Sequence, residues 1–507
     1  MRDKIESIDP VSGEVIKSYS LPKEEEIGEI VDRSREASLS WGDTSLAERS
    51  EYLGAIREIV VDELENIVDV IQRDTGKPEV EVMMSDVLAT LELIKYYENN
   101  LEEILSREKR KTPLIFYQNE SYVDYEPYGV VLVIAPWNYP FQLALIPTVT
   151  ALAAGNTVVL KPSEVTPYTG EMIEKVLEQA DLPSGVFQVI QGDGEVGEKI
   201  IEQEPDKVFL TGAVETGKKV MKKASKNLIP VQLELGGKDP MIVFEDAQID
   251  RAVKGAVYGG LANSGQLCIS VERLYVEDSI KEDFTKKLIR EVKDLDIGDE
   301  NSRDFELGPM IREEQIDVVR DQFEDAISKG AESLTEWKTE GRYLFPQVLV
   351  NVDHSMKVMK EETFGPLIPV MGFNDEEEAI KLANDSEYGL DASVWSENIS
   401  KAKRIASDLE TGNCYINDVV KNIGNPYLPF GGAKKSGIGH YHGPEGLKCF
   451  TQSKSVMINK NKTDEINWFP YTEELSETAK KLIHTQYGDI GFLRKIKNLL
   501  ELRKKLK

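Results

Sequence analysis

The chain of 507 residues has few cysteines, few histidines and a deficit of positive charge. Its three cysteines, Cys268, Cys414 and Cys449, include no C-x-x-C pair, which argues against a disulfide scaffold and fits a reducing compartment. Because only four histidines occur, we predict no metal site and expect any catalytic base to be a carboxylate. Lysine and arginine total 61 against 90 for aspartate and glutamate, which disfavours nucleic acid as a partner because phosphates require a basic face.

Uninterrupted apolar runs long enough to cross a bilayer are also missing. Residues 129–160 are apolar in bulk, but Pro136, Pro140, Pro147 and Gly155 divide them into pieces of about 6 to 15 residues, short of the roughly 20 that a span needs. The opening residues MRDKIESIDP lack the apolar core of a signal peptide. We therefore expect a cytoplasmic globular protein of two or three domains.

Strand-like and helix-like segments alternate from residue 129 onward. Apolar runs predict strands at 129–134, 157–160, 186–190, 208–211 and 230–235, with helices between them at about 141–154, 167–180, 195–203 and 215–226. This alternation predicts a parallel, doubly wound sheet, and its recurrence after residue 240 predicts a second α/β domain. The predicted fold class is therefore α/β with two doubly wound domains.

The first third of the chain is predicted to be mainly helical. Ser45 and Glu48 form a capping-box pattern ahead of one long helix that Gly76 and Pro78 stop. A second helix is expected at about 79–105. Aromatic and β-branched residues at 114–126 predict a short hairpin.

Residues 491–507 reverse the charge of the chain, with seven basic residues and one acidic residue. In a helix they would form an apolar stripe of Phe492, Ile496, Leu499, Leu500 and Leu506. One hypothesis is a helix packed on the acidic body of the protein. The other is a helix that binds a membrane surface or a partner.

Two glycine-rich turns follow predicted strands and are candidates to bind a cofactor phosphate through backbone N–H groups. The turn GDGEVG, Gly192 to Gly197, satisfies G-x-G-x-x-G, which is a weak signal alone. The turn GAVETGK, Gly212 to Lys218, is close to a Walker A loop. However, Lys219 stands where a hydroxyl would bind magnesium, which weakens a phosphotransferase hypothesis. Each turn could equally be structural.

Three residues are candidates for catalysis, and each has a structural alternative. Cys268 lies in the small polar turn NSGQLCIS, which suits an accessible thiol, although most free cysteines are core residues. Glu234 ends an apolar strand, where it could be a general base or the ion-pair partner of Lys238. Asn138 lies in the proline-bracketed corner PWNYP, where its amide could donate to an oxyanion or merely form a turn.

Taken together, seven motifs resemble the NAD(P)-dependent aldehyde dehydrogenase superfamily and occur in its order across nearly all of residues 5–460. They are PWNYP at 136–140, KPSE at 161–164, FLTGAVETGK at 209–218, LELGGK at 233–238, GQLC at 265–268, EETFGP at 361–366 and LPFGGAKKSGIG at 428–439. The stretch from Leu233 to Val276 most resembles a bacterial branch of succinate-semialdehyde dehydrogenases. Three departures from the family pattern are Ala213 after Thr211-Gly212, His440 after Gly439, and the tail beyond about 460.

The resemblance implies a catalytic set. Cys268 would attack a small-molecule aldehyde to form a thiohemiacetal, whose oxyanion Asn138 and the Cys268 backbone N–H would hold. Hydride transfer to the nicotinamide would leave a thioester, which water activated by Glu234 would release as the acid. The cofactor-binding residues implied are Trp137, Lys161, Glu164, Gly212, Ala213, Gly217, Leu235, Glu362 and Phe364.

Within that set, the turn from Gly212 to Gly217 would cradle the pyrophosphate, and Glu362 would bind the nicotinamide ribose. Lys161 and Glu164 would hold the adenosine ribose. A carboxylate at Glu164 would repel a 2′-phosphate, which favours NAD over NADP, although the nearby Lys161 weakens that preference and NADP stays open.

The resemblance also implies domain boundaries and an assembly. We expect a homodimer or homotetramer. The expected parts are an NAD-binding domain of residues 1–112 and 128–236, an oligomerisation hairpin and strand at 113–127 and 448–460, a catalytic domain at 237–447, and a C-terminal extension at 461–507 with a basic amphipathic helix.

The substrate stays open between succinate semialdehyde, a long-chain or apolar aldehyde oxidised near a membrane, and a broad range of aldehydes. The pocket positions suggested by Tyr139, Gln142, Leu143 and Ile146 supply no cation for a second carboxylate, and the basic tail fits peripheral membrane contact. A non-catalytic binding protein on the same fold is a third hypothesis, which the joint presence of Cys268, Glu234 and Asn138 argues against.

Overall fold

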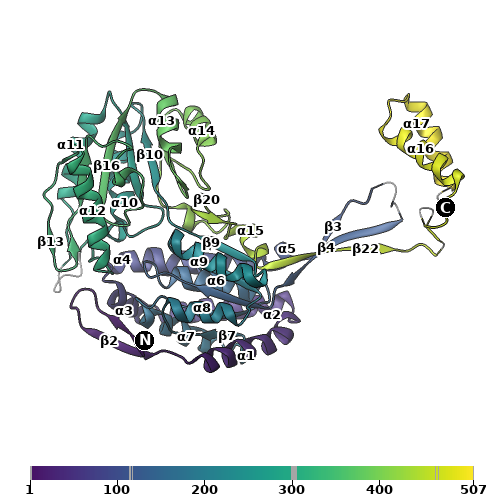
Figure 1. Cartoon of the computed structure of the whole chain (residues 1–507), viewed down its shortest axis with the longest axis horizontal. Coiled ribbons are helices and arrows are strands. Elements are labelled where there is room, and N and C mark those ends of the chain that lie inside the picture. The colour runs from purple at the N-terminus through teal and green to yellow at the C-terminus, as the bar shows by residue number, and fades with distance from the viewer. Residues whose placement is uncertain are drawn as a thin grey trace. The chain divides into compact units, whose positions relative to one another are not determined.

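The computed structural model describes residues 3–113, 116, 118–298, 305–462, 464–465 and 468–505 (Figure 1). The chain divides into two units. Unit 1 comprises Met1–Ser106 and Tyr125–Ser453, and unit 2 comprises Arg107–Asp124 and Lys454–Lys507. In the described part of the chain, no helix is both long and apolar enough to cross a membrane.

The first sheet of unit 1 has six strands in the order β21-β9-β8-β5-β6-β7. Its inner strands are parallel, and β21 joins β9 antiparallel. Side chains of β5 alternate between two apolar clusters, Val131 and Val133 in one and Val130 and Leu132 in the other, so both faces of the sheet are covered. The strands are β5 (Val130–Ile134), β6 (Thr157–Lys161), β7 (Phe187–Val189), β8 (Lys207–Thr211), β9 (Val231–Glu234) and β21 (Gly437–Ile438). The helices between them are α6 (Gln142–Ala153), α7 (Pro167–Gln179), α8 (Gly194–Glu202) and α9 (Val214–Ala224).

The second sheet of unit 1 has seven strands in the order β12-β15-β16-β11-β10-β18-β19. All its pairs are parallel except β12 with β15. The strands are β10 (Asp239–Val243), β11 (Val271–Glu277), β12 (Glu332–Ser333), β15 (Gln347–Val350), β16 (Leu367–Phe373), β18 (Ser393–Trp395) and β19 (Tyr415–Ile416). The accompanying helices are α10 (Ile249–Leu261), η4 (Ala262–Gly265), α11 (Lys281–Lys293), α12 (Glu314–Ser328), η5 (Lys357–Met359), α13 (Glu376–Asn384) and α14 (Ile399–Asp408). The predicted fold class, α/β with two doubly wound parts, is confirmed.

The N-terminal part differs from the prediction in two respects. It opens with an antiparallel hairpin, β1 (Lys4–Ile8) and β2 (Val15–Ser20), before helix α1 (Glu24–Gly42). The long helix expected up to Gly76 is two helices, α2 (Leu46–Asp62) and α3 (Leu64–Thr75), separated at Glu63. The capping box is present, since the Ser45 hydroxyl accepts the Glu48 N–H at 3.2 Å. The second helical run consists of α4 (Glu79–Glu81), a π-helix η1 (Val82–Leu88) and α5 (Ala89–Leu105).

Unit 2 contains most of a three-stranded sheet and two helices. The strands, in the order β22-β4-β3, are β3 (Glu108–Arg110), β4 (Asn119–Pro127) and β22 (Thr451–Asn459). The hairpin predicted at 114–126 is misplaced: its strand β4 lies largely in that segment but pairs antiparallel with β3, which lies before it. Residues 114, 115 and 117 lie outside the described residues. Helices α16 (Glu473–Tyr487) and α17 (Phe492–Lys505) are joined by a 2.9 Å hydrogen bond from the Asn498 amide to the Thr485 hydroxyl.

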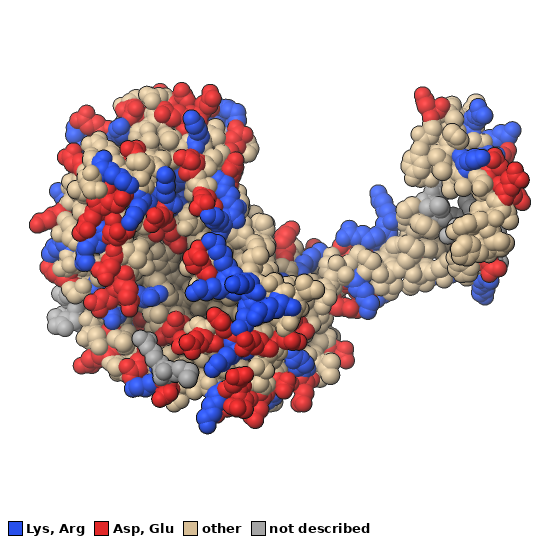
Figure 2. Space-filling model, viewed as in Figure 1, with Lys and Arg blue, Asp and Glu red and all other residues tan. Residues whose placement is uncertain are grey.

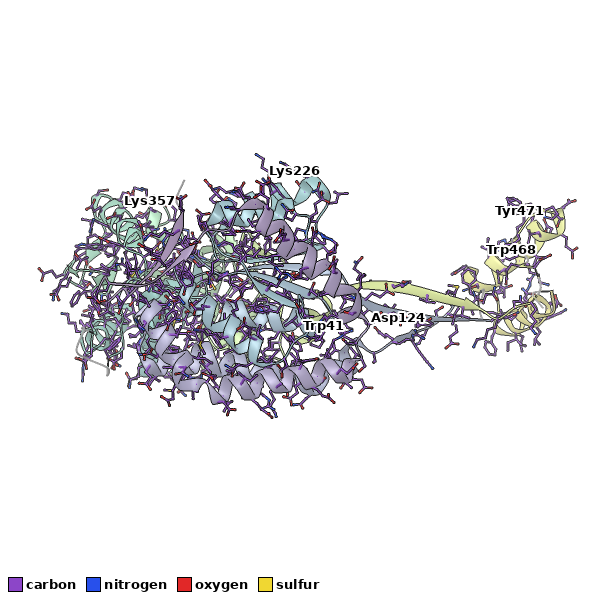
Figure 3. The ribbon with its side chains drawn as sticks, turned by 90° about the horizontal axis from the view of Figure 1, so that it is seen from below. Trp41, Asp124, Lys226, Lys357, Trp468 and Tyr471 are labelled. Atoms are coloured by element: carbon purple, nitrogen blue, oxygen red, sulfur yellow. The ribbon has the colours of Figure 1, made fainter. Side chains whose placement is uncertain are left out.

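Short elements complete unit 1. They are η3 (Ser225–Asn227), β13 (Thr339–Glu340), β14 (Tyr343–Leu344), β17 (Tyr388–Gly389), η6 (Asn422–Gly424), β20 (Ala433–Lys434) and α15 (Gly443–Lys448). Trp41 of α1, labelled in Figure 3, is buried in the apolar core behind the first sheet. Its indole N–H donates to the Leu152 carbonyl of α6 at 3.2 Å. The carboxyl ends of β5, β8 and β9 share one edge of that sheet, which is where ligands bind in such folds.

Candidate active site

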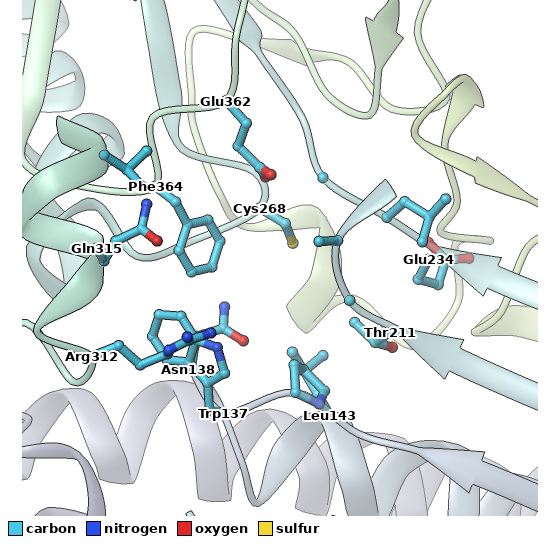
Figure 4. A pocket seen from close by; sticks show the side chains of 16 residues that line it. Trp137, Asn138, Leu143, Thr211, Glu234, Cys268, Arg312, Gln315, Glu362 and Phe364 are labelled. Atoms are coloured by element: carbon cyan, nitrogen blue, oxygen red, sulfur yellow. The ribbon is translucent and has the colours of Figure 1, made fainter. Parts of the chain in front are cut away.

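A cavity of about 300 Å³ lies at that edge of the first sheet in unit 1 (Figure 4). It brings together all three predicted catalytic residues, Cys268, Glu234 and Asn138. Six of the predicted cofactor residues line it as well: Trp137, Gly212, Ala213, Leu235, Glu362 and Phe364. These residues come from five distant stretches of the chain, so the shared cavity supports the roles predicted for them.

The turn before Cys268 has an unusual backbone. Asn263, Ser264 and Gly265 all have left-handed φ angles, of 50°, 54° and 74°. Such angles are unfavourable for residues with a Cβ, whereas Gly265 tolerates them. A Cβ at Gly265 would also lie 2.3 Å from the Gly365 carbonyl oxygen. Three consecutive left-handed residues reverse the chain between α10 and β11, and Cys268 is left partly exposed at the cavity.

Asn138 is tied to the same turn. Its side-chain amide donates to the Gln266 carbonyl at 3.0 Å, and the Asn263 amide donates to the Asn138 carbonyl at 3.1 Å. A side-chain amide has two hydrogens, so this contact leaves one for a ligand. These two hydrogen bonds join the corner PWNYP to the turn before Cys268. Asn138 is buried and lines the same cavity as Cys268.

Burial raises the pKa of the Cys268 thiol well above its usual value, and the carboxylates of Glu362, Asp239 and Glu234 raise it further. Low polarity and negative neighbours both disfavour a thiolate. Both effects favour the neutral thiol of Cys268 over the thiolate.

Glu234 is a buried carboxyl group with few hydrogen-bond donors around it. Gln232 donates to one oxygen at 3.3 Å, while the other oxygen has no hydrogen-bond partner within the described residues. Burial raises the pKa of Glu234 well above its usual value. The alternative ion pair with Lys238 is wrong, because the Lys238 ammonium lies 2.7 Å from Glu272 instead. An unpartnered oxygen of this kind can bind and deprotonate a water molecule.

Glu362 and Phe364 lie on the other side of the cysteine from Glu234 (Figure 4). The Gly237 N–H donates to a Glu362 carboxyl oxygen at 3.1 Å. Burial raises the pKa of Glu362 to about 8, the nearby Glu272 adds to the shift, and the Gly237 hydrogen bond opposes it. The Phe364 ring meets the Trp137 indole edge to face, with centroids 5.3 Å apart. The two rings form an apolar wall next to a carboxyl.

Three predicted cofactor residues lie outside the described lining of the cavity. Gly217 is buried in α9, and Lys161 is buried with its ammonium donating to the Pro162 carbonyl at 2.9 Å. The ammonium also lies 3.4 Å from Glu164, whose side chain is 45% exposed and thus accessible to a ribose hydroxyl. Burial lowers the pKa of Lys161, and Glu164 opposes that shift.

The two glycine-rich turns differ at the helices that follow them. The Asp193 carboxylate caps α8 by accepting the N–H groups of Glu195 at 3.0 Å and Val196 at 3.2 Å. Helix α9 begins after Ala213, whose methyl group cannot cap it. An anion would compete with Asp193 at the first helix, whereas at α9 it would meet N–H groups that no side chain of Ala213 can satisfy. The N-terminus of α9 thus differs from that of α8 in having no cap from the side chain of its N-cap residue.

The structure adds lining residues that sequence motifs did not identify: Arg312, Gln315 and Val318. Among the described residues that line the cavity, Arg312 alone carries a positive charge. Gln315 and Val318 lie three residues apart in α12, a helical spacing that could have indicated a shared face but not its partner, and Arg312 lies two residues before that helix. Of the four suggested substrate positions, Leu143 lines the cavity, while the Tyr139 hydroxyl donates to Glu81 at 2.8 Å.

Comparisons with known proteins identify the class. The aldehyde dehydrogenase family matches residues 1–456, and the chain belongs to it. A 4,4′-diapolycopene aldehyde oxidase from Methylomonas sp is 42% identical over 493 residues, covering 97% of this chain and 93% of that protein. These findings confirm the prediction of an NAD(P)-dependent aldehyde dehydrogenase.

Solved structures agree with that assignment. Betaine aldehyde dehydrogenase from Staphylococcus aureus in complex with NAD+ superposes with a TM-score of 0.87 at 35% identity, covering 92% of this chain and 94% of that one. The putative aldehyde dehydrogenase PutA from Anabaena variabilis has a TM-score of 0.87 at 33% identity, covering 92% of this chain and 100% of that one.

Proposed function

We propose that the chain oxidises an apolar aldehyde to a carboxylate with NAD+, using Cys268 as the nucleophile. The observation that carries this proposal is the shared cavity of Cys268, Asn138 and Glu234. The Cys268 thiol releases its proton to solvent water as its sulfur forms a bond to the aldehyde carbon, and the free hydrogen of the Asn138 amide donates to the resulting oxyanion. Loss of a hydride from that carbon to a bound dinucleotide would leave a thioester. Glu234 then takes a proton from water, whose oxygen attacks the thioester; the carbon–sulfur bond breaks and the carboxylate leaves.

The residues present fit a dinucleotide. The N-terminus of α9, after Gly212 and Ala213, suits the pyrophosphate, and Glu362 suits the ribose next to the nicotinamide. Phe364 and Trp137 offer apolar surface for the nicotinamide ring. When bound, NAD+ accepts the hydride from the carbon held on Cys268. We propose NAD rather than NADP because Glu164 is exposed where a 2′-phosphate would meet its charge.

The surroundings of the thiol favour an apolar aldehyde. Cys268 packs against a large apolar cluster that includes Tyr139, Leu143 and Ile146, and Leu143 also lines the cavity. Burial of hydrocarbon in such surroundings is favourable, whereas a carboxylate there would lose its hydration. A relative of similar length is named for 4,4′-diapolycopene aldehyde, a carotenoid aldehyde.

Succinate semialdehyde is the second candidate, and one observation favours it. Arg312 lines the same cavity and has a side chain that is 44% exposed, 3.7 Å from Glu314. A guanidinium can bind a carboxylate through two hydrogen bonds, so an acidic aldehyde would have a cationic partner at the mouth of the cavity.

The deciding test is a panel of aldehydes with NAD+ and with NADP+, followed by NADH or NADPH absorbance. We expect kcat/KM to rise with chain length among neutral aldehydes and to exceed that of succinate semialdehyde. Cys268→Ser should abolish turnover, while Cys414→Ser, outside the described lining of the cavity, should retain it. Turnover by the Cys268→Ser protein would refute the covalent mechanism, and a preference for succinate semialdehyde would refute the apolar class.

Unit 2 supports a contact with a membrane surface. On α17 the side chains of Phe492, Ile496 and Leu500 recur at a spacing of four and are 76%, 40% and 58% exposed; Leu506 of the predicted stripe lies outside the described residues. Basic residues Arg494, Lys495 and Lys497 accompany them. Trp468 and Tyr471, labelled in Figure 3, are also exposed in unit 2, and much of its visible face in Figure 2 is uncharged. Apolar side chains flanked by cations suit an anionic lipid surface.

Co-sedimentation with anionic and neutral vesicles tests this contact. The full chain should bind anionic vesicles, and a chain ending near residue 460 should not. The double variant Phe492→Ser/Leu493→Ser should lose binding, while Leu228→Ser, which removes an equally exposed leucine from unit 1, should retain it. Equal partitioning of the full and shortened chains would refute the membrane contact.

We further propose a cytoplasmic homodimer or homotetramer with β4 and β22 at the subunit contact. Most of β22 is exposed along its length, as an unpaired sheet edge would be. We assign strands β5 to β9 of the first sheet to the NAD-binding domain (residues 1–112 and 128–236) and the second sheet to the catalytic domain (residues 237–447), from which β21 extends to pair with β9. Light scattering of the purified chain would give the subunit number, and a monomer would refute the assembly.

A further inference from the structure

The loop that carries Glu362 and Phe364 is held by a buried carboxylate on β11. The two oxygens of Glu272 accept the backbone N–H groups of Thr363 and Phe364, both at 2.8 Å. One carboxylate thus contacts two consecutive residues of a loop that lies 91 positions further along the chain. Hydrogen bonds to an ionised acceptor are stronger than neutral ones.

These bonds act on a strained residue. Phe364 has a left-handed φ of 50°, which is unfavourable for a side chain of this size. Its N–H is bound by Glu272, and its phenyl ring lies against the Trp137 indole. Without the acceptor, the backbone at Phe364 would relax and the ring would leave the wall of the cavity.

Lys238 and Gln322 complete the support. The Lys238 ammonium lies 2.7 Å from Glu272 and donates to the Thr363 hydroxyl at 2.8 Å. That hydroxyl donates to the Gln322 side chain at 2.7 Å, and the Gln322 amide donates to the Glu362 carbonyl at 3.0 Å. All three consecutive residues from Glu362 to Phe364 are therefore bound by buried side chains of the second sheet and its helix α12.

We propose that Glu272 is a positioning residue of the cofactor site, which holds Glu362 and Phe364 where the nicotinamide ribose and ring bind. This inference rests on the proposed placement of NAD+ in the cavity. Glu272 touches neither cofactor nor substrate and acts through the backbone of the loop. A purely structural ion pair would be replaceable by uncharged residues without loss of binding, whereas a positioning acceptor would not.

Two variants separate the acceptor from the charge. In Glu272→Gln, the amide oxygen can accept one of the two N–H groups, while its NH2 group cannot accept the other. Because that change leaves Lys238 buried and unpaired, the double variant Lys238→Met/Glu272→Gln removes both charges and avoids a misfolded result. We expect either variant to raise the Kd for NAD+, measured by calorimetry, about tenfold, since one charge-assisted hydrogen bond is lost.

The matched control is a second buried ion pair of the same unit. Lys77 and Asp86 lie 2.7 Å apart with side chains 1% and 0% exposed. Asp86→Asn should lower the melting temperature as Glu272→Gln does, yet leave the Kd for NAD+ unchanged. In the Glu272 variants, the rate at which iodoacetamide alkylates Cys268 without NAD+ should also stay within about twofold of wild type, because other contacts hold that turn.

Glu362→Gln, measured in parallel, distinguishes two kinds of failure. A Kd for NAD+ that rises in Glu362→Gln but stays within about twofold of wild type in both Glu272 variants would refute the positioning role alone. A Kd that is unchanged in all three would refute the proposed placement of the cofactor. A raised Kd in the Asp86→Asn control would show that any buried ion pair has this effect and would also overturn the inference.

Discussion

Replacing Gly237 with alanine should impair catalysis by displacing the backbone of Cys268. A Cβ at this position would lie 2.4 Å from the Cys268 carbonyl oxygen, and 2.8 Å from the nearer Asp239 carboxyl oxygen. Ordinary contacts between such atoms begin near 3.4 Å, so the distance from the new Cβ to the Cys268 carbonyl oxygen must increase by about 1 Å. Because that oxygen belongs to the backbone, it cannot move away by a side-chain rotation, and the backbone itself must shift. Gly237→Ala therefore tests whether the thiol depends on close packing behind it.

The size of the effect follows from the geometry of attack. A misplacement of about 1 Å between nucleophile and carbonyl can cost roughly a hundredfold in rate. We expect kcat/KM for the best aldehyde of the panel to fall about a hundredfold and the alkylation rate of Cys268 to change in parallel. Gly194→Ala is the control, because a Cβ there meets nothing within 4 Å.

Steady-state NADH formation, alkylation by iodoacetamide and a thermal melt together decide the outcome. A folded Gly237→Ala protein with kcat/KM and alkylation rate within about twofold of wild type would refute the close approach of Gly237 to Cys268. A loss of similar size in Gly194→Ala would show that the effect is not specific to this contact.

Three further predictions concern single side chains. Glu234→Gln should retain a burst of NADH but lose steady-state turnover, and loss of the burst would contradict the role of Glu234. In the wild type, steady-state turnover should rise with pH, because the raised pKa of Glu234 keeps this residue protonated at lower pH. Burial lowers the pKa of His442 to about 3, so its stabilisation of the fold is lost as pH falls below the ordinary value of about 6.5. Relative to wild type, His442→Phe should therefore gain about 2 kcal/mol in unfolding free energy between pH 7.5 and pH 5, measured with urea, and parallel pH profiles would contradict this. Glu164→Gln should lower the KM for NADP+ relative to that for NAD+, and an unchanged ratio would contradict the charge argument.

Local pattern was sufficient for much of the fold. The runs of β5, β6 and β8 are apolar on both faces, so periodicity and flanking turns located them within about a residue. The long helix before Gly76 was predicted as one element, because the pattern of apolar residues continues through Glu63 where the structure separates α2 from α3. The hairpin at 114–126 was misplaced because its true partner, β3, is short and charged.

The motifs and their order along the chain resemble the aldehyde dehydrogenase family, and that resemblance implied that Cys268, Glu234 and Asn138 act together. Only the tertiary structure decided what surrounds them. Lys238 pairs with Glu272 rather than Glu234, and Arg312 reaches the cavity from a turn before α12 that carries no motif. Partners of buried charges depend on packing between segments far apart in sequence, whereas the turns and strand ends that carry the motifs are specified by their own local residues.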